Sequence, residues 1–356
     1  MKRPTIAARL GVVLAVTAAT GGLLVGCGSS GGPAASSGGN EPLRVSMDEA
    51  CAAAAEESGD VNYVASTDPA VFAEEIAPFT AKHPDFKINY TNLRSDNASQ
   101  RLLAEAQTRH ALSFDALSGD LPGFDPLFQQ DMVRNVDWPA LGVADDLVIK
   151  QQNGTAWRNY RLITGLGYNS ALVSKDQLPN TWKELADPKW AGKVIVDPRG
   201  SYLGGIALAY GEQETIDWFN DFMETTKPLI IQGATASAQK VISGEALLTT
   251  SAADANIRES HAAGAPIDIK YLDVVPTSDY HTVLMKDSPR PNKTACFVAW
   301  LASDEGAAQK AKLEFQNNDS NPPAVPPTSK LVLTDSPEAL KTSTDTSTAL
   351  AKIMSN

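Results

Sequence analysis

The sequence has few of the residues that usually carry catalytic or metal chemistry. Its 356 residues include three cysteines and four histidines. The histidines (His83, His110, His261 and His281) lack the spacing of a helical metal site. No C-x-x-C pair, phosphate-binding P-loop or dinucleotide-binding glycine set occurs. We therefore expect neither a metal site nor a cofactor.

Basic residues are also scarce. The chain has 42 Asp and Glu against 30 Lys and Arg, a formal net charge of −12. This balance argues against a nucleic-acid partner, which would require a basic face. The apolar content of 43% is ordinary for a globular protein. After the N-terminal segment, no apolar run approaches the roughly 20 residues of a membrane span.

The N-terminal segment has the pattern of an export signal. Residues 1–26 begin with basic side chains and continue as a short apolar run that is rich in small residues. Their last three residues and Cys27 read Leu-Val-Gly-Cys, which resembles a bacterial lipobox. The resemblance implies cleavage before Cys27, acylation of its thiol by palmitate-type chains, and anchoring to the outer face of the cytoplasmic membrane. Loss of residues 1–26 removes three basic groups and no acid, which changes the net charge to −15.

Residues 27–42 are rich in Gly, Ser and Ala, a composition that predicts a flexible tether. Beyond the tether, Cys51 and Cys296 form an even pair in an oxidising compartment. They either form a disulfide or remain two separate buried thiols, and the sequence leaves both readings open.

The folded part begins with alternating strand and helix patterns. The spacing predicts a helix over 48–57, then strands at "VNYVAS", "KINYTNL" and "FDALSGD" separated by helices. Pro78 interrupts the first of these separating helices and predicts a kink or break. A second α/β series starts at "KVIVD" and runs to about residue 274, whereas the Ser/Thr-rich segment 331–356 has only short helix potential. This β-α-β-α-β order predicts an α/β fold with mostly parallel sheets.

Several segments, taken in order, resemble bacterial extracellular solute-binding proteins of ABC importers. The most specific is "PNTWKELADPKWAGKVIVDPRGS" at 179–201, and the similarity extends from about residue 58 to about 315. The nearest branch resembles the ferric-, thiamine- and phosphonate-binding members. The resemblance implies the two-lobed type II periplasmic-binding-protein fold with hinge strands. We expect lobe 1 to comprise 43–162 and 275–316, and lobe 2 to comprise 163–274 and 317–356.

This family resemblance implies a monomeric, membrane-anchored receptor that binds a small solute and delivers it to a permease, without catalysis. In α/β sheets, ligands lie beyond the carboxyl ends of strands, where helix N-termini begin. Arginine side chains near such positions on both lobes favour an anionic ligand, such as an organophosphonate, a phosphate ester or a carboxylate. The predicted ligand-binding residues are Ser66, Thr67, Arg94, Ser95, Ser118, Gly119, Arg199, Gly200, Ser201, Tyr202, Ser251, Asp254 and Tyr280.

Ferric iron, free or chelated, is the alternative ligand. Ferric-binding members carry adjacent tyrosines about ten residues after a Gly-Glu dipeptide, but here Asp254 and Ala255 occupy that place after Gly244. If Asp254 faces the cleft, it could accept a cationic group, and a zwitterionic ligand would then fit. The plainer interpretation is that Asp254 caps the following helix.

Functions of another class are also open. Ser237 and Lys240 match the S-x-x-K motif, and Ser95 begins an S-D-N triplet, as in penicillin-interacting serine hydrolases. Their chain order is reversed and no K-T-G follows, so we expect binding and not catalysis. A sensor or adhesive lipoprotein without a transport role is a third reading. The sequence identifies neither the ligand nor the permease.

Overall fold

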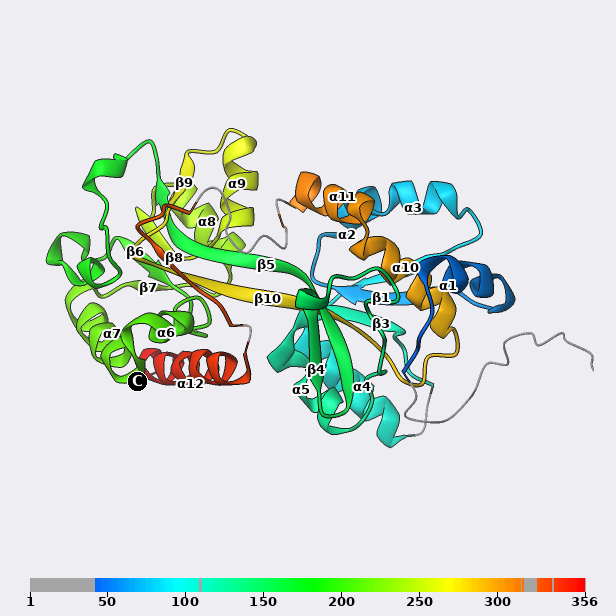
Figure 1. Ribbon diagram of the computed structural model, residues 1–356. Helices are drawn as coiled ribbons and strands as arrows, with labels where there is room; N and C mark the ends of the chain where they lie inside the picture. Colours follow the sequence, from blue (N-terminus) through cyan, green and yellow to red (C-terminus); the bar gives the residue numbers. More distant parts are fainter. Residues whose placement is uncertain (1–41, 109–110, 315, 317–324, 335, 356) are drawn as a thin grey trace, which may run out of the picture. The chain divides into compact units, whose positions relative to one another are not determined.

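The computed structural model describes residues 42–108, 111–314, 316, 325–334 and 336–355 (Figure 1). The described residues belong to one compact unit. The predicted signal peptide, Cys27 and all of the predicted tether except Pro42 lie outside the described residues. No helix in the described ranges is long and apolar enough to cross a membrane.

The elements alternate between strand and helix along most of the chain. The first ten are α1 (Met47–Ala53), β1 (Val61–Ala65), α2 (Pro69–Glu75), α3 (Ala77–Lys82), β2 (Ile88–Asn92), α4 (Ser95–Gln107), β3 (Ala116–Asp120), α5 (Leu121–Gln129), β4 (Val148–Gln151) and β5 (Gly154–Asn169). The next eight are β6 (Val194–Val196), α6 (Ala207–Tyr210), α7 (Glu212–Thr226), β7 (Leu229–Ile230), α8 (Ala234–Ile242), β8 (Leu248–Ala253), α9 (Asp254–Ala262) and β9 (Ile267–Lys270). The last five are β10 (Val274–Leu284), α10 (Pro291–Ala302), α11 (Asp304–Glu314), β11 (Lys330–Val332) and α12 (Pro337–Met354).

Short 3-10 turns fill several connections. They are η1 (Ala54–Glu56), η2 (Asp145–Leu147), η3 (Lys175–Gln177), η4 (Lys183–Ala186), η5 (Pro188–Trp190) and η6 (Gly204–Ile206). The sixth of them follows β6 and lies in the predicted ligand-binding loop.

The strands follow the order β2-β1-β3-β10-β5-β8-β6-β7. The pairs β2-β1 and β1-β3 are parallel, as are β8-β6 and β6-β7. Between these parallel groups, β10 and β5 run antiparallel to each other and to their outer neighbours. The predicted α/β class with mostly parallel outer strands is confirmed.

Strands β5 and β10 belong to both groups, as Figure 1 shows. Strand β5 pairs with β4 and β10 up to Ile163, and with β8 and β9 from Thr164 onward. We call the elements α1 to β4 with α10 and α11 the first half. The elements β6 to β9, with α6 to α9, β11 and α12, are the second half. The predicted lobe boundaries lie close to this division and stay a prediction.

Each half has its own apolar core. In the first half, Phe79, Phe297 and Trp300 pack together with ring centroids 5.3–5.5 Å apart. In the second half, Phe219 and Phe222 lie in a cluster that also contains Leu350 of α12. Burial of such side chains contributes about 1.5–3 kcal/mol each, so α12 is anchored to the second half by its apolar side.

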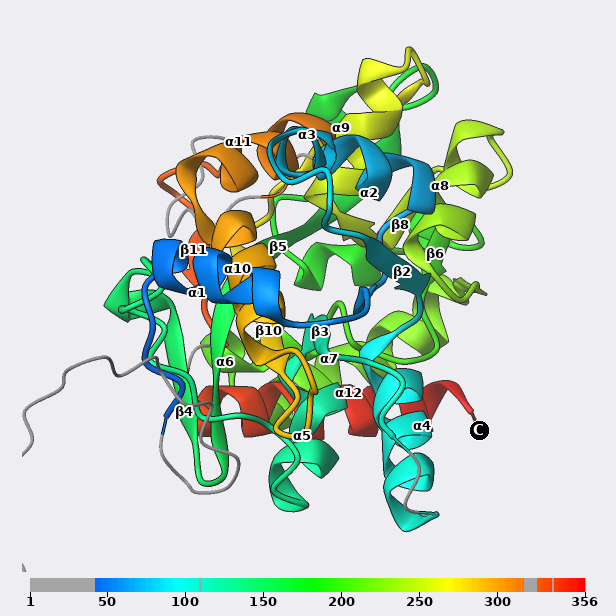
Figure 2. The ribbon, with the colours of Figure 1, turned by 90° about the vertical axis from the view of Figure 1, so that its right-hand side faces the viewer.

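A disulfide between Cys51 and Cys296 joins α1 to α10. The two helices lie side by side in Figure 2. Helix α1 begins with a capping box, in which Ser46 and Glu49 bond each other's backbone N–H groups. The sequence left open whether these cysteines form a disulfide or two separate thiols, and in the structure they form the disulfide.

The structure agrees with one sequence-based expectation about the helices and corrects another. At Pro78, the predicted single helix is divided into α2 and α3, with Pro78 in the first turn of α3, where its missing N–H is tolerated. At the other end of the chain, α12 is an 18-residue helix where only short helices were expected. Its Ser/Thr content lowers helix propensity, but tertiary packing of its apolar side compensates.

Candidate functional site

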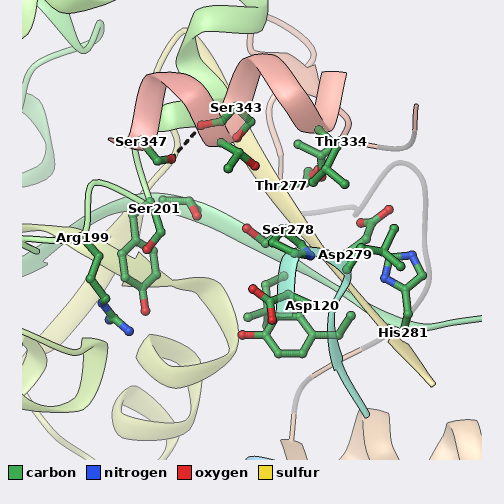
Figure 3. A pocket seen from close by; sticks show the side chains of 18 of the residues that line it. Asp120, Arg199, Ser201, Thr277, Ser278, Asp279, His281, Thr334, Ser343 and Ser347 are labelled. Atoms are coloured by element: carbon green, nitrogen blue, oxygen red, sulfur yellow. Dashed lines mark hydrogen bonds between the residues drawn. The ribbon is translucent and has the colours of Figure 1, made fainter. Parts of the chain in front are cut away.

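A cavity of about 300 Å³ lies where the two halves meet the strands β5 and β10. This volume is at the lower end of the range for small-molecule sites. From the first half and the two strands, it is lined by Arg94, Asp120, Leu121, Pro122, Leu162, Thr164, Thr277, Ser278, Asp279, Tyr280 and His281. From the second half, it is lined by Arg199, Ser201, Tyr202, Thr334, Leu340, Ser343, Thr344 and Ser347. Figure 3 shows most of these side chains around one space.

Arg199 reaches the cavity from the loop after β6. Asp197 is buried at the end of that strand and accepts hydrogen bonds from Nε and Nη2 of Arg199 at 2.8 and 2.6 Å. Burial raises the pKa of Asp197, but the bonds from Arg199 and from the Gly233 backbone outweigh it and hold the pKa below its usual value. The same ion pair raises the pKa of Arg199. Arg199 is thus an oriented, permanent cation, partly neutralised by its partner.

Arg94 lies at the N-terminus of α4, in the other half. It pairs with Asp96 through a longer contact of 3.3 Å, and both side chains are about half exposed. Such exposed pairs contribute little energy. The charge of Arg94 is therefore held by a weaker ion pair than that of Arg199. Arg94 occupies the N-cap position of α4 and makes no side-chain cap bond.

Two tyrosines line the cavity, one from strand β10 and one from the loop after β6. Tyr280, on β10, stacks on Tyr160 with ring centroids 4.7 Å apart, while Tyr202 follows β6. Burial raises the pKa of both phenols, and the charges of Asp120 and Tyr202 raise that of Tyr280 further. Both side chains are therefore neutral hydroxyl groups at ordinary pH.

The floor of the cavity contains a buried ionic group. Asp279 accepts two hydrogen bonds from Arg161, at 2.5 and 2.7 Å, and lies 3.6 Å from Nη1 of Arg158. Beside them, burial lowers the pKa of His281 to about 4, and the two arginines act in the same direction against the attraction of Asp279. His281 is thus neutral near pH 7.

Five of the thirteen predicted ligand-binding residues line this cavity. They are Arg94, Arg199, Ser201, Tyr202 and Tyr280. The other eight do not line it, and for most of them the structure shows a different role.

In the first half, Ser95 donates a hydrogen bond to Asp120, so it positions a cavity-lining carboxylate from behind. Gly119 packs against Ser95, and a Cβ at Gly119 would overlap that side chain. Ser118 is buried and accepts a bond from Nδ2 of Asn159 at 3.2 Å. Ser66 is exposed at the end of β1, and the backbone carbonyl of Thr67 accepts a bond from Tyr90.

In the second half, Gly200 adopts a positive φ of 68°, and a Cβ there would come within 2.5 Å of the Ser347 carbonyl oxygen. Gly200 therefore permits close packing of this loop against α12. Ser251 is fully buried in β8.

Asp254 lies at the start of α9 but does not cap it, because the N-cap is Ala253 and no side-chain cap bond forms. Its carboxylate accepts a hydrogen bond from the Tyr271 hydroxyl and lies 3.2 Å from Nη1 of Arg258. The carboxylate is thus engaged by its own neighbours. Among the described residues, Asp120 is the carboxylate that lines the cavity without an arginine partner.

Sequence reasoning missed the strand residues that line the cavity, apart from Tyr280, and the whole α12 wall. One signal was available for α12: Leu340, Ser343, Thr344 and Ser347 have the spacing of a single helix face.

The His, Cys, Asp and Glu side chains of the described residues form one cluster with the spacing of a metal site, Cys51, His83 and Cys296, and its two sulfurs form the disulfide. The hydrolase motifs also do not converge. Ser95 lies on α4 of the first half, whereas Ser237 is buried on α8 of the second half.

Comparison with known proteins identifies the class. Residues 74–336 match the family of bacterial extracellular solute-binding proteins, so the chain belongs to this family. The resemblance predicted from the sequence is thereby confirmed, and the family is one of binding and not of catalysis.

Particular relatives are distant. An 87-residue stretch is 36% identical to iron uptake protein A1 of Synechocystis sp., and it covers 23% of this chain and 24% of that protein. The chain spans between about a quarter and about a half of the length of the curated relatives it matches.

Solved structures agree over a larger share of the chain. Iron-bound HitA from Pseudomonas aeruginosa has a TM-score of 0.66 and 17% identity, over 81% of this chain and 99% of that one. AfuA from Actinobacillus pleuropneumoniae with bound fructose-6-phosphate has a TM-score of 0.63 and 17% identity, over 83% and 97%. At these identities the likeness establishes the fold alone, and it confirms the predicted two-lobed periplasmic-binding-protein architecture.

Proposed function

We propose that this protein is the solute receptor of an ABC importer and that it captures a small organic oxyanion in the cavity between its halves. The observation that carries the proposal is that Arg94 and Arg199, one from each half, line the same cavity. An oxyanion between them would favour the closed arrangement of the halves, since it would interact with both cations only there. Organophosphonates, phosphate esters and carboxylates share the required chemistry.

The remaining lining supports a ligand with further polar groups. Hydroxyls of Ser201, Tyr202 and Tyr280 can donate to oxyanion oxygens. Asp120 adds a carboxylate that could accept an amine, so a zwitterionic ligand remains within the proposal, with Asp120 in the role expected for Asp254.

The test uses two arginines of α4 as a matched pair. The side chain of Arg94 is 51% exposed and lines the cavity, whereas that of Arg101 is 53% exposed and pairs with Glu105 of the same helix. Native mass spectrometry of the purified protein and a thermal-shift screen of oxyanions come first. A ligand at 100 times its dissociation constant should add about 2.7 kcal/mol of stability.

We expect Arg94→Gln to weaken oxyanion binding about 10- to 100-fold, the value of a hydrogen bond to a charged group. Arg101→Gln should bind as the wild type does. Equal affinities of both variants and the wild type would remove Arg94 from the site, and stabilisation by cationic ligands alone would overturn the oxyanion proposal.

Ferric iron is the second candidate, because Tyr202, Tyr280 and Asp120 bring two phenols and a carboxylate into the same cavity. Iron uptake is also named for the Synechocystis relative, and HitA was solved with iron bound. The raised pKa values of both tyrosines count against it, since phenolate ligands must lose their protons.

Titration with ferric citrate distinguishes the two ligands. An iron site predicts a visible phenolate-to-iron absorption band that Tyr202→Phe and Tyr280→Phe abolish and Arg94→Gln leaves in place. An oxyanion site that takes the citrate predicts the opposite: binding without the band, weakened by Arg94→Gln.

We further propose that acylated Cys27 anchors the receptor to the outer face of the cytoplasmic membrane. The support is the lipobox-like sequence before Cys27 together with membership of an extracellular family. Labelling of cells with a palmitate analogue should mark the wild type and not Cys27→Ala, and the variant should be released into the soluble fraction. An unlabelled wild type would contradict the anchor.

A further inference from the structure

Helix α12 forms one wall of the cavity. Leu340, Ser343, Thr344 and Ser347 line the space and lie at i, i+3, i+4 and i+7, which places them on one face of the helix. That face presents one apolar side chain and three hydroxyl groups. In Figure 3, Ser343 and Ser347 lie on this helix, and Ser201 and Ser278 lie across the space below it.

Two glycines hold this wall against the loop that carries Arg199. A Cβ at Gly204 would overlap both Ser347 Oγ and the Ser343 carbonyl oxygen, and one at Gly200 would meet the Ser347 carbonyl oxygen. Thr346 and Leu350 of α12 are completely buried, and a Cβ at Gly200 would also meet Leu350 Cβ at 3.1 Å. The wall is therefore packed into the second half and keeps a fixed position relative to Arg199.

The hydroxyls of this wall are available to a ligand. Ser347 Oγ donates to the Ser343 carbonyl at 2.7 Å, a bond within the helix. In the part of the chain that the structure describes, the hydroxyls of Ser343 and Thr344 have no hydrogen-bond partner. A ligand that fills the cavity would remove these two groups from water, and unpaired polar groups in that setting are costly.

We propose that the α12 wall makes the receptor selective for oxyanions that carry a hydroxylated carbon chain, such as phosphate monoesters of polyols. This rests on the proposed oxyanion function and specifies its substrate class. The oxyanion end would bind near Arg94 and Arg199, and hydroxyls along the chain would pair with Ser343 and Thr344. A bare alkyl chain of the same length would leave both hydroxyls unpaired. Sites built to bond a ligand hydroxyl discriminate strongly against analogues without it.

The experiment uses ligand pairs that differ only in hydroxyl content. Calorimetric titration of the full chain compares glycerol 3-phosphate with propyl phosphate, and sorbitol 6-phosphate with hexyl phosphate. The wild type should bind at least one polyol ester tenfold or more tightly than its alkyl partner. The double variant Ser343→Ala/Thr344→Val should lose that preference, by weakening the polyol ester at least tenfold while the alkyl ester changes less than about twofold.

Thr348→Val is the matched control. Thr348 is exposed on the next turn of α12, and its hydroxyl donates to the Thr344 carbonyl as that of Ser347 does to Ser343. It does not line the cavity, so this variant should bind both esters as the wild type does. A thermal scan checks that all variants are folded.

The outcomes separate the two proposals. Equal binding of polyol and alkyl esters, or equal weakening of both by the double variant, overturns the inference. If Arg94→Gln still weakens both esters in that case, the oxyanion function stands without its hydroxyl selectivity. Failure of every oxyanion in the screen to bind would overturn both.

Discussion

The packing of α12 against the loop after β6 can be tested by a glycine-to-alanine substitution, which adds one methyl group. Gly204 and Gly205 are neighbours in η6, and neither has a positive φ, so alanine is tolerated by the backbone at both positions. A Cβ at Gly205 would meet Pro276 Cβ at 3.1 Å, a tight contact that a shift of a few tenths of an ångström relieves. A Cβ at Gly204 would lie far inside the 3.0 Å that real Cβ contacts respect, and one of the atoms it meets is a backbone carbonyl oxygen.

The expected magnitude follows from this difference. Both substitutions lower the entropy of the unfolded chain by the same amount, so that term cancels when the two variants are compared. Overpacking by one methyl group costs about 1–3 kcal/mol when the neighbours cannot move freely. If α12 shifts to relieve the overlap, the burial of Leu350, worth about 1.5–3 kcal/mol, is weakened as well. We expect Gly204→Ala to be about 2–3 kcal/mol less stable than Gly205→Ala.

Thermal unfolding measures this difference. For a chain of this size, 2–3 kcal/mol corresponds to a Tm lower by about 5 °C. Limited proteolysis should also cut α12 faster in Gly204→Ala, because a displaced helix exposes its backbone. Equal Tm values for the two variants would refute the close approach of α12 to this loop.

The remaining predictions concern the disulfide and the buried histidine. Replacing Cys51 and Cys296 by Ser should lower the free energy of unfolding by about 2–4 kcal/mol. Addition of dithiothreitol should destabilise only the wild type. A wild-type Tm that does not change with the reductant would contradict the presence of the disulfide. Burial lowers the pKa of His281 to about 4, below its unfolded value of 6.5, so the unfolded chain binds the extra proton between these pH values. Stability should therefore be full above about pH 6.5 and fall by about 3 kcal/mol as pH decreases to 4. His281→Asn should flatten that part of the curve in denaturant titrations, and parallel curves for variant and wild type would show that His281 titrates normally.

Local patterns in the sequence predicted much of the fold. The first three strands and their helices were predicted because each is a short apolar repeat bounded by Pro, Gly or a capping residue. The same patterns placed Arg94 and Arg199 after strand ends, where the cavity forms. Chain segments that are far apart in the sequence but adjacent in space were not predicted, and α12 is the main example.

The hydrogen-bond partners of side chains in the candidate site were the second feature that the sequence did not predict. Asp254 directly follows β8 and Ser118 lies in the second part of the predicted strand "FDALSGD", but Tyr271 and Asn159 form hydrogen bonds with them. These partners lie 17 and 41 residues away, beyond the reach of any local motif. Gly200 shows the same limit, because the helix that requires a glycine there is formed by residues nearly 150 positions later.

The position of β10 between β3 and β5 determines when the first half can fold. A chain that is synthesised from its N-terminus has β1, β2 and β3 complete well before residues 274–302 are available. Until then β3 lacks its neighbour, Phe297 and Trp300 are missing from the interior, and Cys51 has no partner 245 residues downstream. Contacts of such long range slow folding. Until those residues are available the early strands keep an open edge, the state in which a chaperone or a protease would bind them.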